Sequence, residues 1–187
     1  MTAEILAWAG RQLTLADWEA IPEDEQFRLE LAEGVLSITQ RPLSLHQRAV
    51  VRLTRLDEQL PPDLTSMAEM EVIDTEGPLT LRTPDLIVTR EVVVERNVPR
   101  VDAADVLLAV EILSDGTRKV DRILKFAEYA EAGIAQYWIV DLDEPASLRA
   151  FTLVDAAYEL SGEFTGPVTL DVAGQAVAVD PSGLTRR

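Results

Sequence analysis

The first strong pattern in the chain is an alternation of apolar and polar residues over positions 27–40, FRLELAEGVLSITQ. Successive side chains of a strand point to opposite faces, so Arg28 and Glu30 share one face while apolar residues occupy the other. The dipeptide Glu33-Gly34 interrupts the alternation and suits a two-residue turn. The segment therefore predicts an antiparallel hairpin with one apolar and one polar face.

Three segments repeat apolar residues every three or four positions, which is typical of helices. The first begins at Thr14, an N-cap residue, and stops near Pro22. The second covers residues 43–60, with an apolar stripe formed by Ala49, Val50, Leu53, Leu56 and Leu60. The third covers about residues 117–132, with a stripe formed by Val120, Ile123, Leu124, Ala127 and Ala130. That stripe predicts Lys125 on the opposite, polar side of the third helix.

Short apolar runs predict strands at residues 67–74, 78–82, 85–90, 106–113 and 135–141, with further short strands from residue 147 onward. The order strand, helix, strand over residues 106–141 requires a crossover, which joins two parallel strands. The hairpin adds antiparallel pairs. We therefore expect an α/β (α+β) fold in which helices flank a mixed central sheet.

Composition limits the size and setting of the fold. A chain of 187 residues, 47% of them hydrophobic, can form one domain, which we expect over residues 1–187, with a core at about 12–145 and short C-terminal strands at 147–180. No apolar run is long enough to span a bilayer, and the N-terminus lacks the features of a secretory signal. With no cysteine, the chain is expected to be cytoplasmic, with no membrane partner.

Charge limits the partners. A net charge of −16 argues against binding nucleic acid over the whole surface, because phosphate contacts need lysine or arginine. Any contact with nucleic acid must therefore be local.

Glu111 is the most unusual residue of the sequence, because it lies inside the apolar run VLLAVEIL. An unpaired buried carboxylate costs several kcal/mol, so Glu111 needs a cation, a metal ion, a proton or an open end of the sheet. Two readings remain open at this point. Glu111 either belongs to a functional site or lies at the end of its strand, where it points to solvent or to an arginine.

Asp85 is a second carboxylate at the start of an apolar strand, directly after Pro84. Two acids on neighbouring strands can share a divalent cation, since Mg²⁺ takes oxygen ligands and needs one or two protein carboxylates. The alternative is an ordinary turn residue after proline.

Lys125 is one of only two lysines in a chain that has fifteen arginines. An amine can lose its proton beside a metal-bound water, whereas a guanidinium stays charged, so lysine suits the work of a catalytic base. The alternative is a solvated helix pair with Asp121, four residues earlier. A cationic cluster of Arg118, Lys119, Arg122 and Lys125 opposes the helix dipole, and a phosphate-bearing substrate could dock there.

The segments LELAEGVL, PDLIV and VEILSDGTRKVDRILKFAEYAEAGIAQYWIVD, with a histidine at position 46, resemble the Uma-two family, bacterial proteins of the PD-(D/E)XK restriction-endonuclease-like superfamily. The resemblance covers roughly residues 12–145. Its motif matches at Glu111, Ser114, Asp121, Lys125, Tyr129, Gly133, Tyr137, Trp138 and Asp141. The superfamily pattern usually places lysine two residues after the acid, where this chain has Leu113, so the resemblance implies a lysine that has moved to the helix at Lys125.

The resemblance implies a nuclease with its site at one edge of a sheet. Asp85 and Glu111 would hold Mg²⁺ or Mn²⁺, Glu30 would hold the metal or a ligand water, and Lys125 would orient or deprotonate the attacking water. The implied function is a metal-dependent endonuclease that hydrolyses phosphodiester bonds of nucleic acid, with DNA favoured.

Two further residues are candidates with an alternative. His46, the sole histidine, is either a satisfied structural residue or part of the site, and Tyr129 either packs in the core or holds the lysine or a ligand. We count both with the substrate-binding candidates Arg118, Lys119 and Arg122. The rival function is a catalytically silent module that binds nucleic acid or protein in the same groove, and the acidic surface suggests a homodimer or a basic partner.

Overall fold

The fold is described from a computed structural model, which covers residues 3–75, 78–113 and 120–186, without the side chains of Ala3, Val120, Asp121 and Arg122. Strands form two large sheets and a separate two-stranded sheet. The first large sheet has the order β2-β1-β5-β4-β7, with bounds β1 (Phe27–Ala32), β2 (Val35–Gln40), β4 (Val72–Asp74), β5 (Thr80–Arg82) and β7 (Val101–Asp102). Its pairs are antiparallel except for β4 and β7.

The second sheet has the order β11-β10-β9-β8-β6-β3. Its strands are β3 (Leu64–Ala68), β6 (Leu86–Arg90), β8 (Val106–Ile112), β9 (Gln136–Asp141), β10 (Ser147–Val154) and β11 (Ala157–Phe164). Only β8 and β9 pair in parallel, and α5 (Val120–Glu131) connects them. This confirms the predicted crossover and the mixed α/β class. The small third sheet pairs β12 (Val168–Val172) with β13 (Gln175–Val179).

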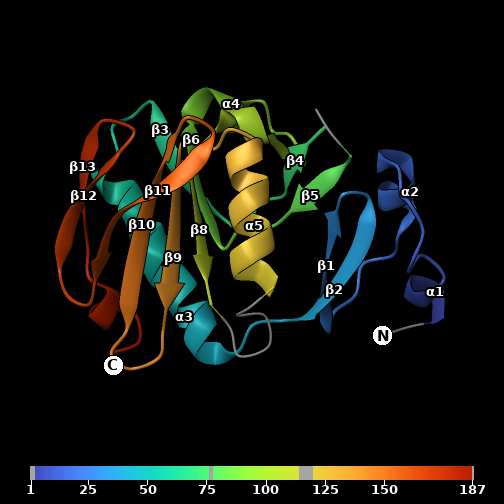
Figure 1. The fold of residues 1–187 in the computed structure, drawn as a ribbon, viewed down its shortest axis with the longest axis horizontal. Helices are drawn as coiled ribbons and strands as arrows, with labels where there is room; N and C mark the ends of the chain where they lie inside the picture. Colours follow the sequence, from blue (N-terminus) through green and yellow to red (C-terminus); the bar gives the residue numbers. More distant parts are fainter. Residues whose placement is uncertain (1–2, 76–77, 114–119, 187) are drawn as a thin grey trace.

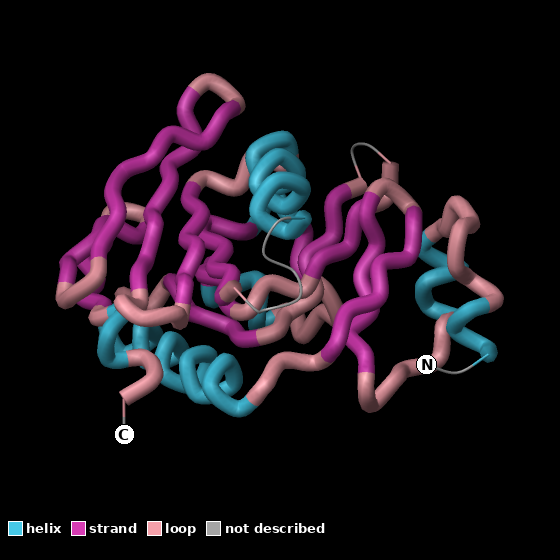
Figure 2. The backbone as a smooth tube through the Cα atoms, turned by 60° about the horizontal axis from the view of Figure 1, so that its bottom comes forward, coloured by secondary structure: helices cyan, strands magenta, loops and turns pink. Residues whose placement is uncertain are grey.

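The other helices are α1 (Ala3–Leu6), α2 (Leu15–Ala20), α3 (Ser44–Leu53) and α4 (Glu91–Glu95). Short 3₁₀ turns occupy Thr54–Gln59, Ala103–Asp105 and Pro181–Gly183. Figures 1 and 2 show α5 between the two large sheets, while α1 and α2 lie at the far side of the first sheet. Within the described ranges, no helix combines the length and the apolar character needed to cross a membrane.

Three apolar cores hold the sheets and helices together. The β12–β13 pair and α3 pack on one face of the second sheet, in a core that contains Trp138. Tyr137, the preceding residue of β9, points to the opposite face and packs in a second core with residues of α5. The N-terminal helices and the first sheet share the third core. Tyr137 and Trp138 are both buried, as expected of packing residues.

Local sequence signals were accurate where the backbone itself needs particular residues. The hairpin of β1 and β2 turns at Glu33 and Gly34, which both have positive φ, as a type I′ turn requires. Thr14 caps α2 in a capping box with Asp17. The second predicted helix forms as α3, but from Thr54 it tightens into a 3₁₀ turn.

Two predictions were wrong. The single strand at 67–74 is two strands, β3 and β4, which belong to different sheets; Glu69 has a positive φ of 52° between them, which breaks the extended chain. The buried side of α5 is also not the predicted stripe. Ile123 is 72% exposed and Leu124 is 47% exposed, while Lys125 is only 4% exposed. The helix turns Lys125 inward because the buried carboxylates of Glu30 and Glu111 pair with its amine.

The chain passes repeatedly between the two large sheets. After β1 and β2 it forms β3 of the second sheet, returns for β4 and β5, and crosses again to β6. That last crossing consists of only three residues, Thr83, Pro84 and Asp85. Asp85 therefore lies at the junction of the two sheets.

Candidate active site

Lys125 joins two carboxylates that come from different sheets. Its Nζ donates to Glu111 Oε1 over 2.9 Å and to Glu30 Oε1 over 3.2 Å. Glu30 comes from β1 of the first sheet, Glu111 from β8 of the second, and Lys125 from α5. Glu30 is 3% exposed and Glu111 is 8% exposed, so neither points to open solvent and the solvated alternatives for Glu111 and Lys125 are wrong. Three residues far apart in the sequence thus converge.

Asp85 completes the group at the start of β6. Its Oδ2 accepts from the backbone N–H of Ile112 over 2.7 Å and lies 3.1 Å from His46 Nε2. Its Oδ1 accepts from Arg28 over 3.3 Å. Burial alone would raise the pKa of Asp85, but the hydrogen bond and charge of His46 and the charge of Arg28 outweigh it and hold the pKa below its ordinary value.

Glu111 is the group that is hardest to ionise. Burial raises its pKa to about 7; the charge of Lys125 opposes this rise, and the nearby charges of Asp85 and Glu30 add to it. Tyr129 donates its hydroxyl to Glu111 Oε1 over 2.8 Å. Tyr129 therefore holds the glutamate rather than the lysine, and burial followed by the charge of Glu111 raises the pKa of this tyrosine well above its ordinary value.

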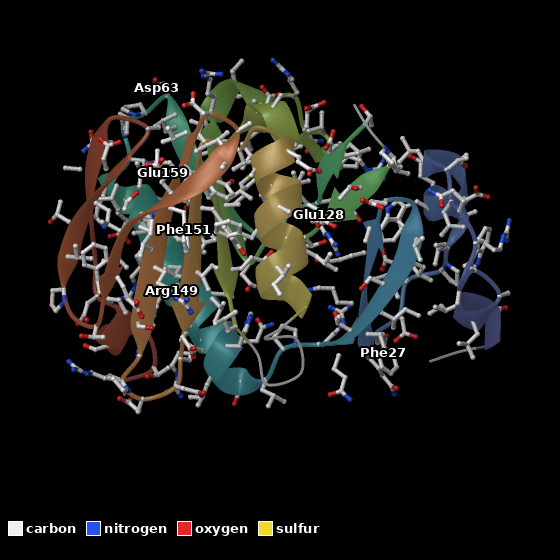
Figure 3. The ribbon with its side chains drawn as sticks, in the orientation of Figure 1. Phe27, Asp63, Glu128, Arg149, Phe151 and Glu159 are labelled. Carbon is white, nitrogen blue, oxygen red and sulfur yellow. The ribbon has the colours of Figure 1, made fainter. Side chains whose placement is uncertain are left out.

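Arg82 connects Glu30 to α5. Its guanidinium donates to Glu30 over 3.0 Å and, through two nitrogens, to both oxygens of Glu128 over 2.8 and 2.7 Å. Figure 3 shows Glu128 on the side of α5 that faces the first sheet. Burial would raise the pKa of Glu30, yet the charges of Lys125 and Arg82 and the backbone N–H of Thr83 lower it overall. These contacts attach α5 to the first sheet at Glu128, which lies about one turn after Lys125.

The structure brings together Glu30, Asp85, Glu111, Lys125, His46 and Tyr129 of the predicted site. Arg118, Lys119 and the side chain of Arg122 lie outside the described residues, so their substrate-binding role stays a prediction. Leu113, at the usual lysine position, is buried in the core, and the lysine that contacts Glu111 is Lys125 of α5. The site does not lie at an edge strand, because β6 and β8 are inner strands of the second sheet.

Sequence reasoning missed Arg28, Arg82 and Glu128. The pattern of β1 predicted a polar face with Arg28 and Glu30 on it. Because the strand is half buried, two charged residues on one face were a signal that both need partners. Arg82, three residues before Asp85, carried no such signal, since its partners are 52 and 46 residues away. Only the folded chain shows that pairing.

Two acids of the site carry the kind of oxygen that a hard divalent cation binds. Asp85 and Glu111 supply carboxylate oxygens. The carbonyl oxygen of Ile112 contacts His46 Nε2, and the backbone N–H of the same residue donates to Asp85. Over the described part of the chain, no three carboxylate or imidazole side chains already surround one metal-sized point. In this arrangement the amine of Lys125 and the guanidinium of Arg28 contact oxygens that a cation would use. Both oxygens of Glu30 are also engaged, by Thr83, Lys125 and Arg82.

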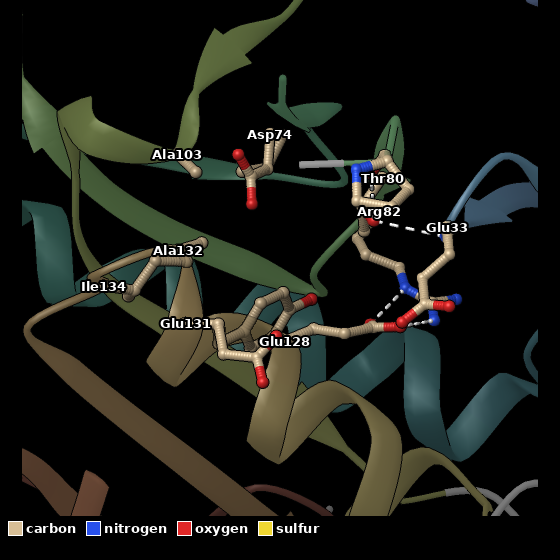
Figure 4. Close-up of a pocket in the computed structure, with 12 residues that line it drawn as sticks. Glu33, Asp74, Thr80, Arg82, Ala103, Glu128, Glu131, Ala132 and Ile134 are labelled. Atoms are coloured by element: carbon tan, nitrogen blue, oxygen red, sulfur yellow. Dashed lines mark hydrogen bonds and ion pairs between the residues drawn. The ribbon is translucent and has the colours of Figure 1, made fainter. Parts of the chain in front are cut away.

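Two hollows flank the network. A cavity of about 240 Å³ lies behind it, between β4, β5 and the end of α5, and Figure 4 shows the Arg82–Glu128 pair among its lining residues. A wider groove of about 560 Å³ lies on the side of Arg28 and Thr83, with Trp18 and Phe27 along it. The groove adjoins Asp85, because Arg28 contacts that carboxylate.

The family described as "Uma2: Putative restriction endonuclease" matches residues 15–179. The chain belongs to the Uma2 family. The Uma2 chain also resembles a crystal structure from Anabaena variabilis ATCC 29413, titled as a "putative nuclease belonging to DUF820". The two share 17% sequence identity with a TM-score of 0.73, over 92% of this chain and 97% of that one. At that identity the likeness shows the fold alone. No protein of curated function matches the Uma2 chain in sequence.

Proposed function

We propose that this Uma2 protein is a divalent-cation-dependent endonuclease that hydrolyses phosphodiester bonds of nucleic acid, with DNA as the favoured substrate. The observation that carries the proposal is the convergence of Lys125 on the buried carboxylates of Glu30 and Glu111, beside Asp85. Family membership and the nuclease title of the structural neighbour point in the same direction. Such work on cellular nucleic acid would take place in the cytoplasm.

Asp85 and Glu111 would hold Mg²⁺ or Mn²⁺, and the ion when bound would stabilise charge on the phosphate and make water more acidic. Glu30 would contact the ion only after releasing one of the donors that now engage it. As the structure stands, its carboxylate orients Lys125 towards Glu111. We therefore assign Glu30 a positioning role first and a role as ligand second.

Lys125 would orient the attacking water; to accept the proton of that water as well, the amine would first have to release to solvent the proton it carries between the two carboxylates. The amine sits 2.9 Å from Glu111, so it is within hydrogen-bond reach of any water bound against that carboxylate. A fixed amine between two carboxylates loses little rotational freedom when water arrives. The hydroxyl of Tyr129 keeps Glu111 in place and would hold this geometry through the reaction.

The substrate strand would approach along the groove of about 560 Å³ beside Arg28. Arg28 is paired with Glu69 and Asp85, so the groove offers little net positive charge from the described residues. Arg118, Lys119 and Arg122 remain our candidates for phosphate contacts. A homodimer or a basic partner could add the remaining cationic surface.

A nuclease assay with Lys125 variants tests the proposal. With Mn²⁺ or Mg²⁺, the wild type should cleave single-stranded or duplex DNA or RNA, and Lys125→Ala should be slower by about 10²-fold or more. Lys125→Arg should remain slow, since a guanidinium keeps the charge but cannot accept a proton. Arg96→Ala is the matched control, because it removes an exposed cation, 59% exposed, beyond the opposite end of β6.

A catalytically silent module that binds nucleic acid or protein is the second candidate. The net charge of −16 and the internal pairing of every site carboxylate with a cation favour it. Cleavage that is equal in the wild type and Lys125→Ala would reject the nuclease, and binding of nucleic acid without cleavage would support the silent module.

A further inference from the structure

The outer face of α3 is a local basic surface in an acidic chain. Residues 34–56 contain four arginines and no aspartate or glutamate, and they form the longest stretch of the sequence without an acid. The four are Arg41, Arg48, Arg52 and Arg55. Within the described ranges, none of them forms an ion pair with a carboxylate, whereas the arginines of the candidate site are all paired. Their positive charge is therefore not neutralised inside the fold.

Three of these arginines lie on one side of α3 and of the 3₁₀ turn that continues it. Arg48, Arg52 and Arg55 follow one another at intervals of four and three residues, the spacing of neighbours on a helix surface. Ala49 and Leu53 point the other way, into the core of the second sheet, while Arg48 and Arg55 are exposed. Like charges at these intervals destabilise a helix, so stability alone does not explain the arrangement.

The C-terminal residues flank this side of the helix without neutralising it. Arg48 donates to the carbonyl oxygen of Thr185 over 3.1 Å, and Arg52 donates to that of Gly183. A carbonyl acceptor carries no net charge, and a guanidinium has five N–H groups, so both arginines keep donors for another partner. Arg186 follows Thr185, is exposed and adds a further cation. Figure 2 shows this end of the chain beside α3.

The first turn of α3 contacts the candidate active site. His46, in that turn, lies 3.1 Å from Asp85 Oδ2. With a rise of about 1.5 Å per residue, Arg55 follows His46 by about 13 Å along the axis, which is the length of about four base-pair steps. A nucleic-acid strand that lay along the arginines would therefore reach the site carboxylates at one end.

We propose that the outer face of α3, formed by Arg48, Arg52 and Arg55, binds the phosphate backbone of nucleic acid and holds it against the candidate active site. The choice of partner rests on the proposed function, because the carboxylates at the end of this face are those of the proposed nuclease. Guanidinium groups match phosphate, to which they donate two parallel hydrogen bonds. Contacts to the backbone carry no sequence information, so this surface selects a polyanion and not a base sequence.

The surface acts after the first contact. The net charge of −16 still opposes the approach of DNA at long range, whereas the local arginines slow its release. The dissociation rate of DNA is therefore the quantity that reports on this face.

Release of a labelled duplex in the presence of a chelator tests the surface apart from cleavage. The double variant Arg48→Gln/Arg55→Gln should release a short fluorescein-labelled DNA duplex about tenfold faster than the wild type, or more. The slope of log affinity against log salt should flatten by about two, one unit for each lost phosphate contact. Glutamine can still donate to Thr185, so the C-terminal contact can persist. Arg48→Lys/Arg55→Lys keeps both charges and should release the duplex more slowly than the glutamine pair.

Arg90→Gln/Arg96→Gln is the matched control, because it removes the same charge at the far end of β6 from Asp85. The control should release the duplex at the wild-type rate. Equal acceleration in this control would be an effect of net charge and would overturn the inference.

The remaining outcomes separate the surface from the nuclease. If the glutamine pair of α3 released the duplex at the wild-type rate while the wild type cleaved DNA, the inference would be wrong and the nuclease proposal would stand. If the wild type held the duplex through these arginines but cleaved nothing, the surface would be supported and the nuclease rejected. Binding of phosphatidylserine vesicles through the same arginines, with no binding of DNA, would assign the face to anionic lipid and overturn the inference.

Discussion

At the scale of single residues, Glu111 shows how a buried acid can keep a raised pKa although a cation contacts it. Lys125 and Tyr129 both donate to the same oxygen, Oε1, and burial still raises the pKa of the carboxyl to about 7. Near neutral pH a larger share of this carboxyl is therefore protonated than of an ordinary glutamate. Asp85 and Glu30, with several donors each, have lowered pKa values instead.

This difference predicts an unusual dependence of stability on pH. The pKa of Glu111 is about 7 in the folded chain and 4.5 ordinarily, so the folded state binds more protons between these values. Its contribution is complete below about pH 4.5 and is lost as the pH rises through 7, which lowers the free energy of unfolding by about 3 kcal/mol. Urea unfolding at a series of pH values from 5 to 8, with a chelator present, measures this loss of stability.

Glu111→Gln is the matched variant for this prediction, because an amide of the same shape cannot titrate. The free energy of unfolding of this variant should change little over the same range, so the wild type should lose stability relative to the variant as the pH rises. Asp85 and Glu30 act in the opposite sense and below about pH 4, outside this window. If the free energies of unfolding of the two proteins changed with pH in parallel, the raised pKa would not belong to Glu111.

The sequence singled out several residues that converge in the folded chain, but it did not reveal their partners. Glu111 and Asp85 stood out because a charge in or beside an apolar strand needs compensation, and Lys125 stood out because lysine is rare here. Arg82 did not, since an arginine in a short strand has no local signature of the glutamates it will meet. Pairing between distant segments follows from topology, which the local pattern does not encode.

At the scale of elements, α5 carries its polar residues inward. Lys125 and Tyr129 are almost fully buried, and Ile123 on the opposite side is largely exposed. Periodicity assigned the apolar side to the core, because that assumption holds when the facing surface is apolar. Here part of the facing surface is a set of carboxylates, so ion pairs as well as apolar contacts determine how the helix is rotated.

The Arg82–Glu128 contact should therefore stabilise the docked helix. Arg82→Met leaves Glu30 and Glu128 without their guanidinium in a buried setting, and we expect a loss of about 3 kcal/mol in the free energy of unfolding. Urea denaturation measures the change.

Arg96→Met is the matched control for the arginine. Its ion pair with Asp105 spans 3.7 Å with the arginine 59% exposed, so its removal should cost well under about 1 kcal/mol. If Arg82→Met lost no more free energy of unfolding than Arg96→Met, the buried pair of Arg82 and Glu128 would not hold α5 in place.

At the scale of the whole molecule, charge governs how a substrate would arrive. A protein of net charge −16 repels DNA at long range, and salt screens that repulsion. The screening length falls from about 30 Å at 10 mM to about 8 Å at 150 mM salt. We expect the association rate with DNA to rise several-fold over this range, which stopped-flow fluorescence can measure.

A strand of the same sequence with uncharged methylphosphonate linkages provides the control, because its association should hardly depend on salt. A steep fall of the rate with salt for normal DNA would be the behaviour of a basic surface. That outcome would indicate that DNA first contacts the local cations Arg118, Lys119 and Arg122 instead.

The division of the chain into two sheets was also beyond local prediction. The strands were found from their apolar runs, but their assignment to two sheets depends on the break at Glu69 and on the link after β5. Neither feature has a strong sequence signature, although Pro84 in that link hinted at a change of direction.

The brevity of that link has a consequence for how variants of this chain can arise. Thr83, Pro84 and Asp85 carry a donor to Glu30 and a site carboxylate within the same three positions. Extra length can be accommodated in most surface loops, but an insertion here would displace both groups together and separate the halves of the site. Natural diversification should therefore lengthen other connections and leave this one at its present length.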